Sequence, residues 1–280
     1  MTLLKTAASL ITGRNCQGFH LRASYLFGLL CIACALIITE APAIELQPGI
    51  IGTDDRRIID QQGAPWSAIG QVNVSSYRRR TRCTGSLIAS NLVITAAHCV
   101  MDSWTRKPFR LHQIHFLAGL RRSDWLSHST AECLHFPPGY EYVGPKKILP
   151  SLPFQKVPRR SFFKDTVLIV LKHSIMNIPP LQIDRAEDLG PDITLVHASY
   201  PADRRNMLSG HLGCRLLRRD QHLWFTDCDS HAASSGGPVF IQRKQELKLA
   251  AILVGVAEKS YSIAVPIADW IDVAAKRKCP

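Results

Sequence analysis

Residues 83–99 read CTGSLIASNLVITAAHC, two short apolar runs followed by a turn of small residues that ends at His98 and Cys99. The runs Thr84 to Ala89 and Leu92 to Thr95 are rich in aliphatic and β-branched residues and are too short for stable helices. We therefore predict that both are strands. The two alanines after the second strand allow a sharp turn that presents the imidazole of His98. This segment predicts a β-structure that holds a histidine at the end of a strand.

The same pattern continues outward from this segment, since short apolar runs alternate with turn residues from Ala64 onward. It is typical of an antiparallel barrel or sandwich rather than of alternating strands and helices. The other predicted strands are Ala68 to Val74, Gln113 to Ala118, Thr166 to Leu171, Thr194 to Ser199, Gly210 to Leu217, Leu223 to Thr226, Val239 to Gln242, Lys248 to Val256 and Ser262 to Pro266. One short C-terminal helix is predicted by the helical spacing of Ile267, Trp270, Ile271 and Ala274.

Residues 134–164 break the strand pattern, because they contain six prolines and little periodicity. They are predicted to form a long connection between two halves of about five or six strands each. Residues 44–60 precede the first predicted strand and are expected to form an extended N-terminal arm. The folded domain would then comprise residues 61–280.

The first 43 residues have the parts of a secretory signal: basic residues, the uncharged run LFGLLCIACALII at 26–38, and Ala41-Pro42-Ala43 as a cleavage site. Cleavage after Ala43 and retention as a membrane anchor both remain open, and both export the domain. Six of the nine cysteines follow residue 43, an even number that suits three disulfides in an oxidising compartment. We expect a secreted or periplasmic protein, with no membrane contact once the signal is cleaved.

The chain is basic, with a formal net charge of +12. The predicted signal contains three Lys or Arg and one Glu, so the remainder carries about +10. Basic clusters occur at 78–80, 159–160 and 215–219, but no helix-turn-helix, zinc-finger or RNA-binding signature accompanies them. We interpret them as solvated surface charges and expect no nucleic-acid partner. The six cysteines after residue 43 form no CxxC pair that would suggest a zinc site, and no cofactor or metal is expected.

A second segment whose residues suit catalysis is Ala233-Ser234-Ser235-Gly236-Gly237-Pro238, a glycine-rich turn before a predicted strand. A serine hydroxyl is a weak nucleophile at its own pKa. An enzyme that uses it needs an imidazole within hydrogen-bond reach and a carboxylate that orients the imidazole. His98 and Ser235 are the candidates for base and nucleophile, and the other ten histidines are interpreted as structural.

These two segments resemble the histidine and nucleophile motifs of the trypsin and chymotrypsin-like serine peptidases. TAAHC at 95–99 and SSGGP at 234–238 occur in the family's order, and the resemblance extends from about Arg57 to Trp270. It implies an all-β fold of two antiparallel six-stranded β-barrels with a short C-terminal helix. It also implies a disulfide between Cys83 and Cys99, and a secreted, monomeric endopeptidase that acts on protein or peptide substrates.

The third member of the triad is expected at Asp165, which precedes the apolar run Thr166 to Leu171 as in the family's aspartate motif. Asp124 and Asp184 precede no such run. By this resemblance Ser235 attacks the scissile carbonyl, His98 transfers the proton and Asp165 fixes the imidazole tautomer. The backbone N–H groups of Ala233 and Ser235 would bind the oxyanion.

The nucleophile motif departs from the family at two positions. Ala233 replaces a glycine and has less conformational freedom, so we expect the oxyanion hole to form only when substrate binds. Ser234 replaces an aspartate that pairs with a new N-terminal amine after zymogen cleavage, so activation by that ion pair is not expected, despite the sequence Arg57-Ile58-Ile59. This change, together with GTDDRR at 52–57, resembles the bacterial glutamyl endopeptidase-like branch. The same comparison pairs Cys214 with Cys228, while the pairing of Cys133 and Cys279 stays open.

Asp229 lies six residues before Ser235, where trypsin-like enzymes carry the carboxylate that binds Arg or Lys side chains. Two roles remain open for it, substrate recognition and a structural role, and no partner is evident in the local sequence. Leu253 lies where the glutamyl-specific group has a pocket histidine, which argues against a preference for glutamate. An alternative function is an inactive homologue that uses the barrels as a binding module.

Overall fold

The computed structural model of this chain describes residues 49–76, 80–142, 162–187, 189–190, 193–257, 260–268 and 270–279. The predicted signal at 1–43 and most of the predicted connection at 134–164 lie outside these residues. Within the described part of the chain, no helix is long and apolar enough to cross a membrane.

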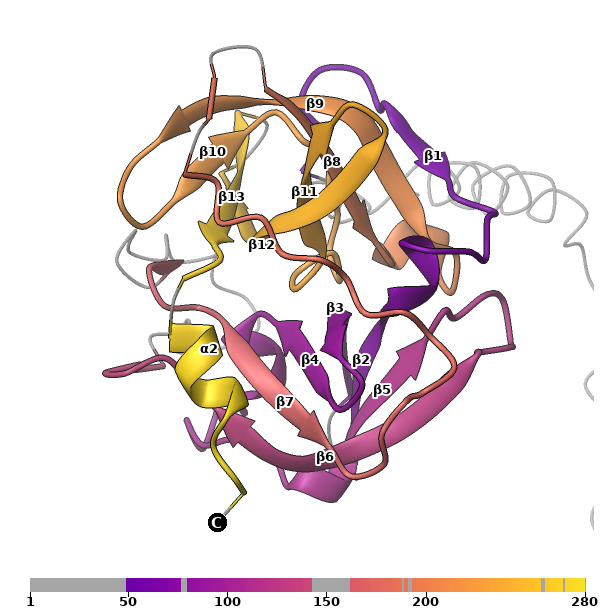
Figure 1. Cartoon of the computed structure of the whole chain (residues 1–280), viewed down its shortest axis with the longest axis vertical. Coiled ribbons are helices and arrows are strands. Elements are labelled where there is room, and N and C mark those ends of the chain that lie inside the picture. Colours follow the sequence, from indigo (N-terminus) through magenta and orange to yellow (C-terminus); the bar gives the residue numbers. More distant parts are fainter. Residues whose placement is uncertain are drawn as a thin grey trace, which may run out of the picture. The chain divides into compact units, whose positions relative to one another are not determined.

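The first half of the chain forms a closed antiparallel barrel with the strand order β2-β3-β4-β7-β6-β5 (Figure 1). Its strands are β2 (Ile69–Ser75), β3 (Arg80–Ala89), β4 (Leu92–Thr95), β5 (Ile114–Ala118), β6 (Ser127–His135) and β7 (Val167–Leu171). In β5 and β6 the side chains of one face are buried and those of the other are more exposed, as expected for a sheet with one face in a core. In β4, which pairs with β3 and β7, all four side chains are buried.

The second half forms another six-stranded barrel, with β8 (Thr194–Ser199), β9 (Ser209–Arg219), β10 (Trp224–Thr226), β11 (Pro238–Arg243), β12 (Glu246–Ala257) and β13 (Tyr261–Pro266). Its strand order is β9-β10-β13-β12-β11-β8, and the pairing of β8 with β9 closes it. A seventh strand, β1 (Arg56–Ile58), pairs with β9 at the edge of this sheet. The prediction of two six-stranded barrels is therefore confirmed.

Two strands are absent from the sequence prediction. β6 reads SHSTAECLH, in which the buried positions are Ser129, Ala131 and Cys133. These residues are small or polar, so they give no apolar alternation in the sequence. β1 has only one buried residue, Arg56, and gives no apolar signal either. The predicted C-terminal helix is confirmed as α2 (Trp270–Ala275), which lies beside β7 and buries Ile271 and Ala274 (Figure 1).

Short 3-10 helices connect the strands: η1 (Trp66–Ala68), η2 (Ala97–Val100), η3 (Leu111–Gln113) and η5 (Ala202–Arg204). Of these, η2 and η5 reach the functional residues described below.

Three disulfides link the six cysteines of the described chain. They join Cys83 to Cys99, Cys214 to Cys228 and Cys133 to Cys279. The first two are the expected pairs, and the third settles the pairing that stayed open in the sequence. It ties β6 to the residues after α2, so it joins positions 146 residues apart in the chain.

His197 on β8 is a buried polar residue in the second barrel, with 1% of its surface exposed. Its Nδ1–H donates to the Pro238 carbonyl at 3.0 Å, and Nε2 has no hydrogen-bond partner within the described residues. Burial lowers the pKa of this imidazole to about 4, against a smaller opposing effect of the Pro238 carbonyl. The ring is therefore neutral when the protein is folded at neutral pH.

Replacing Cys133 and Cys279 together with serine is expected to lower the free energy of unfolding more than replacing Cys214 and Cys228. In the chain-entropy model the long loop contributes up to about 5 kcal/mol and the short one about 3 kcal/mol. Urea unfolding of both double variants under non-reducing conditions measures the difference. Equal losses, or a free thiol at Cys133 or Cys279 in the wild type, would contradict this assignment.

The pKa of His197 predicts an acid-sensitive stability. The unfolded chain binds a proton near pH 6.5 and the folded protein only near pH 4, so the free energy of unfolding should fall as pH falls through this window. The contribution is about 3 kcal/mol at most. In His197→Asn, whose amide can still donate to Pro238, denaturation between pH 7 and 4 should show a smaller slope. An unchanged slope would sink the assignment.

Candidate active site

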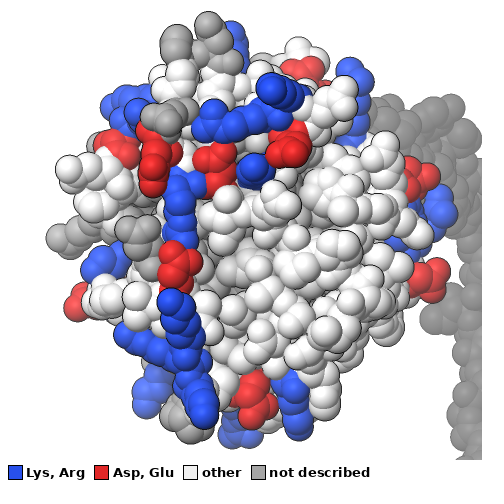
Figure 2. Space-filling view, viewed as in Figure 1, with Lys and Arg blue, Asp and Glu red and all other residues white. Residues whose placement is uncertain are grey.

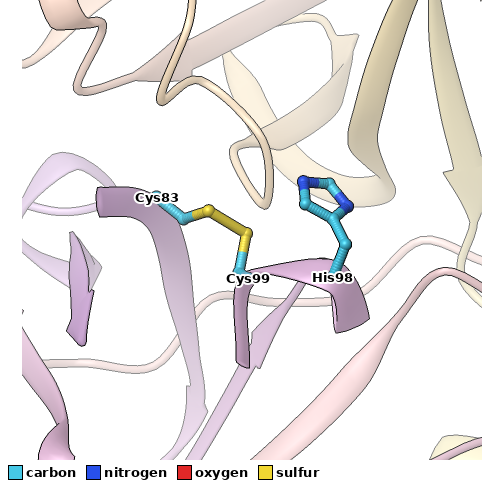
Figure 3. A group of neighbouring side chains, drawn as sticks. All are labelled: Cys83, His98 and Cys99. Carbon is cyan, nitrogen blue, oxygen red and sulfur yellow. A yellow bond between two sulfur atoms is a disulfide. The ribbon is translucent and has the colours of Figure 1, made fainter. Parts of the chain in front are cut away.

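The predicted base, His98, lies in η2 directly after β4, as the small-residue turn in the sequence predicted. Cys99 next to it is joined to Cys83 on β3, so the disulfide braces the turn against the neighbouring strand. Figure 3 shows the imidazole and the disulfide leaving η2 in different directions. The ring is thus free of the disulfide, and its side chain is 33% exposed.

Asp165, just before β7, binds His98 at two points. Its Oδ2 lies 2.6 Å from His98 Nδ1, and its Oδ1 accepts the backbone N–H of His98 at 2.8 Å. A carboxylate can only accept, so Nδ1 carries the proton in this pair and Nε2 is left as the basic nitrogen. The side chain of Asp165 is only 7% exposed. The carboxylate therefore fixes both the tautomer and the orientation of the imidazole.

The surroundings also set the proton affinity of His98. Burial acts to lower its pKa, but the charge of Asp165 and its hydrogen bond to Nδ1 outweigh burial and raise the pKa above the ordinary value. The imidazolium form is thus stabilised next to Asp165. This is the property that a general base needs if it is to hold a proton during a reaction.

Ser235 belongs to the loop between β10 and β11, which presses against β3 of the first barrel. The backbone N–H of Thr84 donates to the Ser235 carbonyl at 2.8 Å, and the Thr84 hydroxyl donates to the Ala233 carbonyl at 3.2 Å. The Ser235 carbonyl is also 3.8 Å from Cys99 Sγ. Ser235 is therefore held next to the turn that carries His98.

This contact depends on Gly236, whose φ is +83°. A Cβ at this position would lie 2.0 Å from the Thr84 carbonyl oxygen and 2.1 Å from Thr95 Oγ1. Only glycine fits so close to another backbone. Among the hydrogen bonds of the described residues, the Ser235 hydroxyl has none to the imidazole.

Ala233 takes a φ of +72°, in the left-handed region that glycine favours. The alanine thus adopts the glycine-like conformation that its Cβ was expected to resist. The preceding carbonyl, of Ala232, accepts the backbone N–H of Ala202 at 2.7 Å. Since the C=O and N–H of a trans peptide point in opposite directions, this bond turns the Ala233 N–H away from η5.

Ser234 is fully buried at the position where the sequence comparison expects an aspartate. Its hydroxyl accepts hydrogen bonds from Ser199 Oγ at 2.9 Å and from the His231 backbone N–H at 3.0 Å. These neutral bonds satisfy the hydroxyl without an ion pair. The turn that carries Ser235 is therefore closed by uncharged groups at this point.

Asp229 is also fully buried, but its carboxylate already has partners. Oδ1 accepts the backbone N–H of Ile51 at 2.8 Å and Oδ2 that of Asp55 at 2.9 Å, while His211 Nδ1 lies 3.3 Å from Oδ2. Burial acts to raise the pKa of Asp229, but these bonds lower it below the ordinary value. The local sequence shows no partner for this carboxylate because its two backbone donors lie 174 and 178 positions away in the chain.

Two groups of side chains in the described part of the chain have the spacing of metal ligands. In the first, Cys83, His98 and Cys99, both sulfurs are consumed by the disulfide and cannot act as thiolates (Figure 3). In the second, Asp55, His211 and Asp229, the Asp229 oxygens accept backbone N–H groups. The disulfide thus accounts for the first group and hydrogen bonding for the second.

Charged residues of both signs share the surface shown in Figure 2. Lys and Arg gather along the upper part of this face and in a stripe down its left side, with Asp and Glu among them. Arg185 pairs with Asp272, Arg215 with Asp227 and Arg243 with Asp184. The basic excess is thus partly compensated locally, which fits the interpretation as solvated charge.

The chain is similar to known proteins in sequence and in structure. The profile of the Trypsin family matches residues 50–123, which include His98 and both cysteines of its disulfide. Phenoloxidase-activating factor 3 of Holotrichia diomphalia is 28% identical over 117 residues, 40% of this chain and 30% of that protein. Serine protease ea of Drosophila melanogaster is 32% identical over 69 residues, 25% of this chain and 16% of that protein. The chain thus matches less than a third of the length of either relative.

Solved structures show the same fold. A Glu endopeptidase superposes with a TM-score of 0.65 at 18% identity, covering 81% of this chain and 100% of the other. A thermostable serine protease, AL20, from an extremophilic microorganism gives a TM-score of 0.52 at 18% identity, with 72% and 91% covered. The chain therefore has the chymotrypsin-like fold of two six-stranded barrels, and its residues 50–123, which carry His98, are similar to the Trypsin family.

Proposed function

We propose that this protein is an exported serine endopeptidase in which His98, Asp165 and Ser235 form the catalytic triad. The observation that carries the proposal is the double hydrogen bond of Asp165 to His98, at a turn against which the Ser235 loop is packed. A structural histidine does not need a buried carboxylate on Nδ1 and a free, partly exposed Nε2. A general base needs both.

In the proposed reaction, His98 Nε2 takes the proton of the Ser235 hydroxyl as its oxygen attacks the carbonyl carbon of the scissile peptide bond. The imidazolium then gives this proton to the leaving amine, and an acyl-enzyme forms. Water attacks the acyl-enzyme with His98 again as base, which frees Ser235. Asp165 stabilises the imidazolium in both steps.

The negative oxygen of each tetrahedral intermediate would be bound by the N–H groups of Ala233 and Ser235. Each such donor typically contributes about 3 kcal/mol to the transition state. The left-handed conformation of Ala233 and the hydrogen bonds of Ala232 and Ala233 to the surrounding chain support this role.

We infer a structural role for Asp229 rather than recognition of Arg or Lys side chains. Both oxygens are occupied by the arm that contains Ile51 and Asp55, and Ser230 next to it donates its N–H to the Gly49 carbonyl at 2.9 Å. A substrate cation at this carboxylate would have to displace the arm. The buried carboxylate of Asp229 is instead compensated by the backbone N–H donors of that segment.

A second candidate function is a binding module that has lost catalysis. Two observations favour it: the Ser235 hydroxyl makes no hydrogen bond to His98 within the described residues, and Ala233 and Ser234 depart from the family motif. Hydrogen bonds of this kind are often formed only in the substrate complex. The ordered His98–Asp165 pair has no use in a binding module, so we favour the enzyme.

Export is supported by the three disulfides and by the signal-like residues 1–43. Disulfides form and persist in oxidising compartments. We propose a secreted or periplasmic protein whose substrates are proteins or peptides.

Ser235→Ala and His98→Ala are each expected to lower kcat for a peptide substrate by about four to six orders of magnitude, because either loss disables the triad as a unit. An organophosphonate probe should label the wild type at Ser235 and neither variant. Ser234→Ala serves as the matched control, since it removes the neighbouring hydroxyl and should leave labelling at Ser235. Turnover within tenfold of wild type in both triad variants, or no labelling of folded wild type, would favour the binding module.

Asp229→Asn is expected to lower kcat/KM for all substrates by a similar factor and to lower thermal stability. The amide would point an N–H at one of the two backbone N–H donors of the arm, a conflict that costs about 1–3 kcal/mol. Peptides with Arg, Lys or Leu before the scissile bond compare the two proteins, and Asp227→Asn, next in space to Arg215, is the control. A wild type that prefers Arg or Lys, with this preference lost selectively in the variant, would instead assign Asp229 to substrate binding.

A further inference from the structure

Arg56 on β1 is the most deeply buried cation in a group of ion pairs that lies outside the triad. Its side chain is only 3% exposed. The guanidinium donates to both oxygens of Asp54, at 2.8 and 2.9 Å, and to both oxygens of Asp203, at 3.2 and 2.7 Å. Two bidentate pairs use the fork geometry of arginine fully. The buried charge is thus compensated by a carboxylate on each side.

Asp203 lies in η5, and Arg204 of the same helix is the second arginine of the group. Arg204 donates to the Arg56 carbonyl at 2.7 Å and to Asp54 Oδ2 at 2.8 Å. The side-chain hydrogen bond from Arg56 holds the pKa of Asp54 at about 2, against an opposing effect of burial. The group therefore stays ionised at neutral pH, and it fastens η5 to the arm at residues 54–56.

The other side of η5 contacts the loop that carries Ser235. Ala202 N–H donates to the Ala232 carbonyl at 2.7 Å, and His231 Nδ1 lies 3.7 Å from Asp203 Oδ1. The Ala202 bond fixes the peptide plane between Ala232 and Ala233. Since an alanine at φ +72° costs about 1–2 kcal/mol more than a glycine, the loop needs such bonds to keep this conformation.

We propose that Arg56 is a positioning residue for the oxyanion hole, acting through Asp203 and Ala202 on the N–H of Ala233. This inference rests on the proposed peptidase function. Arg56 touches neither the triad nor a substrate, but its two carboxylate partners place η5 where its Ala202 N–H can hold the Ala232 carbonyl. The loop that carries Ser235 is then ordered by Arg56, a buried cation within the arm. This ordering does not require the new N-terminal amine that zymogen cleavage creates in trypsin-like enzymes.

The first test measures kcat per active site, counted by titration with the organophosphonate. Arg56→Gln should lower kcat by about tenfold to a thousandfold with KM changed by less than about threefold, because an oxyanion donor acts mainly on the transition state. Arg56→Lys should recover part of the loss, since an ammonium can pair with Asp203 but not in the bidentate manner. Arg57→Gln, the exposed next residue of β1, removes the same charge and should behave as wild type.

The second test does not depend on activity. Hydrogen exchange of the Ala202 amide should be at least about tenfold faster in Arg56→Gln than in Arg57→Gln, because the Ala202–Ala232 bond loses its support. A wild type without peptidase activity would refute the proposed function. This measurement would still test the link from Arg56 through Asp203 and Ala202 to Ala232, which we call the tether. If Arg56→Gln does not fold, Asp203→Asn, whose side chain is 35% exposed, removes the same link from the other side.

An unchanged Ala202 exchange rate would overturn the tether. The proposal would also be overturned if kcat per titrated site stayed within about twofold of wild type in Arg56→Gln and Asp203→Asn. A fall only in the number of titratable sites would mean that Arg56 stabilises the fold and does not position the oxyanion hole.

The same tether predicts the effect of proteolysis at Arg57–Ile58. Ile58 is 53% exposed and lies on the edge strand β1. Cleavage there would separate Arg56 from the chain that carries Ser235. Nicking should therefore lower kcat per titrated site, with the fall in proportion to the fraction cleaved. A rise in kcat on cleavage would show that the arm inhibits rather than supports the site.

Discussion

Thr84 is the constraint on which the candidate site depends, because every polar group of this residue is hydrogen-bonded and two of them bind the loop that carries Ser235. Its N–H donates to the Ser235 carbonyl and its carbonyl accepts from Thr95 Oγ1 at 2.6 Å. Its hydroxyl donates to the Ala233 carbonyl and accepts the Tyr200 N–H at 2.9 Å. Thr84 is fully buried, so none of these bonds competes with water. One residue of the first barrel thereby holds the loop of the second barrel that carries Ser235.

Neutral hydrogen bonds hold the loop that carries Ser235, whereas charged groups hold the arm. At the loop, Ser234 closes the turn with neutral hydrogen bonds. The ionised groups lie farther out, where Arg56 with its carboxylates and Asp229 with its backbone donors hold the arm. A buried charge is tolerated only if it is fully paired, and each of these charges has at least two partners. The arm at residues 49–58 is therefore an integral part of the second barrel and of the candidate site.

Much of the site could be predicted from the sequence because its signals are local. The turn that carries His98, the glycine beside Ser235 and the run after Asp165 each lie within one short segment, and the strands next to them contain short apolar runs. The signals failed where the decisive partner is distant. β6 buries Ser129, Ala131 and Cys133 only because it is a strand of a closed barrel. Arg56 pairs with Asp203, which lies 147 positions away in the chain. No spacing in the sequence marks such a pair, since burial of an arginine depends on carboxylates that the fold alone supplies.

The conformation of Ala233 shows how these long-range bonds bear on the chemistry. An alanine in the left-handed region carries a penalty that glycine avoids, so this position would relax if the loop were free. The loop is held on both sides: Thr84 of the first barrel binds the Ala233 carbonyl, and Ala202 of η5 binds the Ala232 carbonyl. Two consecutive peptide planes are thereby fixed from different parts of the fold. The N–H between these carbonyls has little freedom left, and a donor that needs no reorganisation is what stabilises a developing negative charge most effectively.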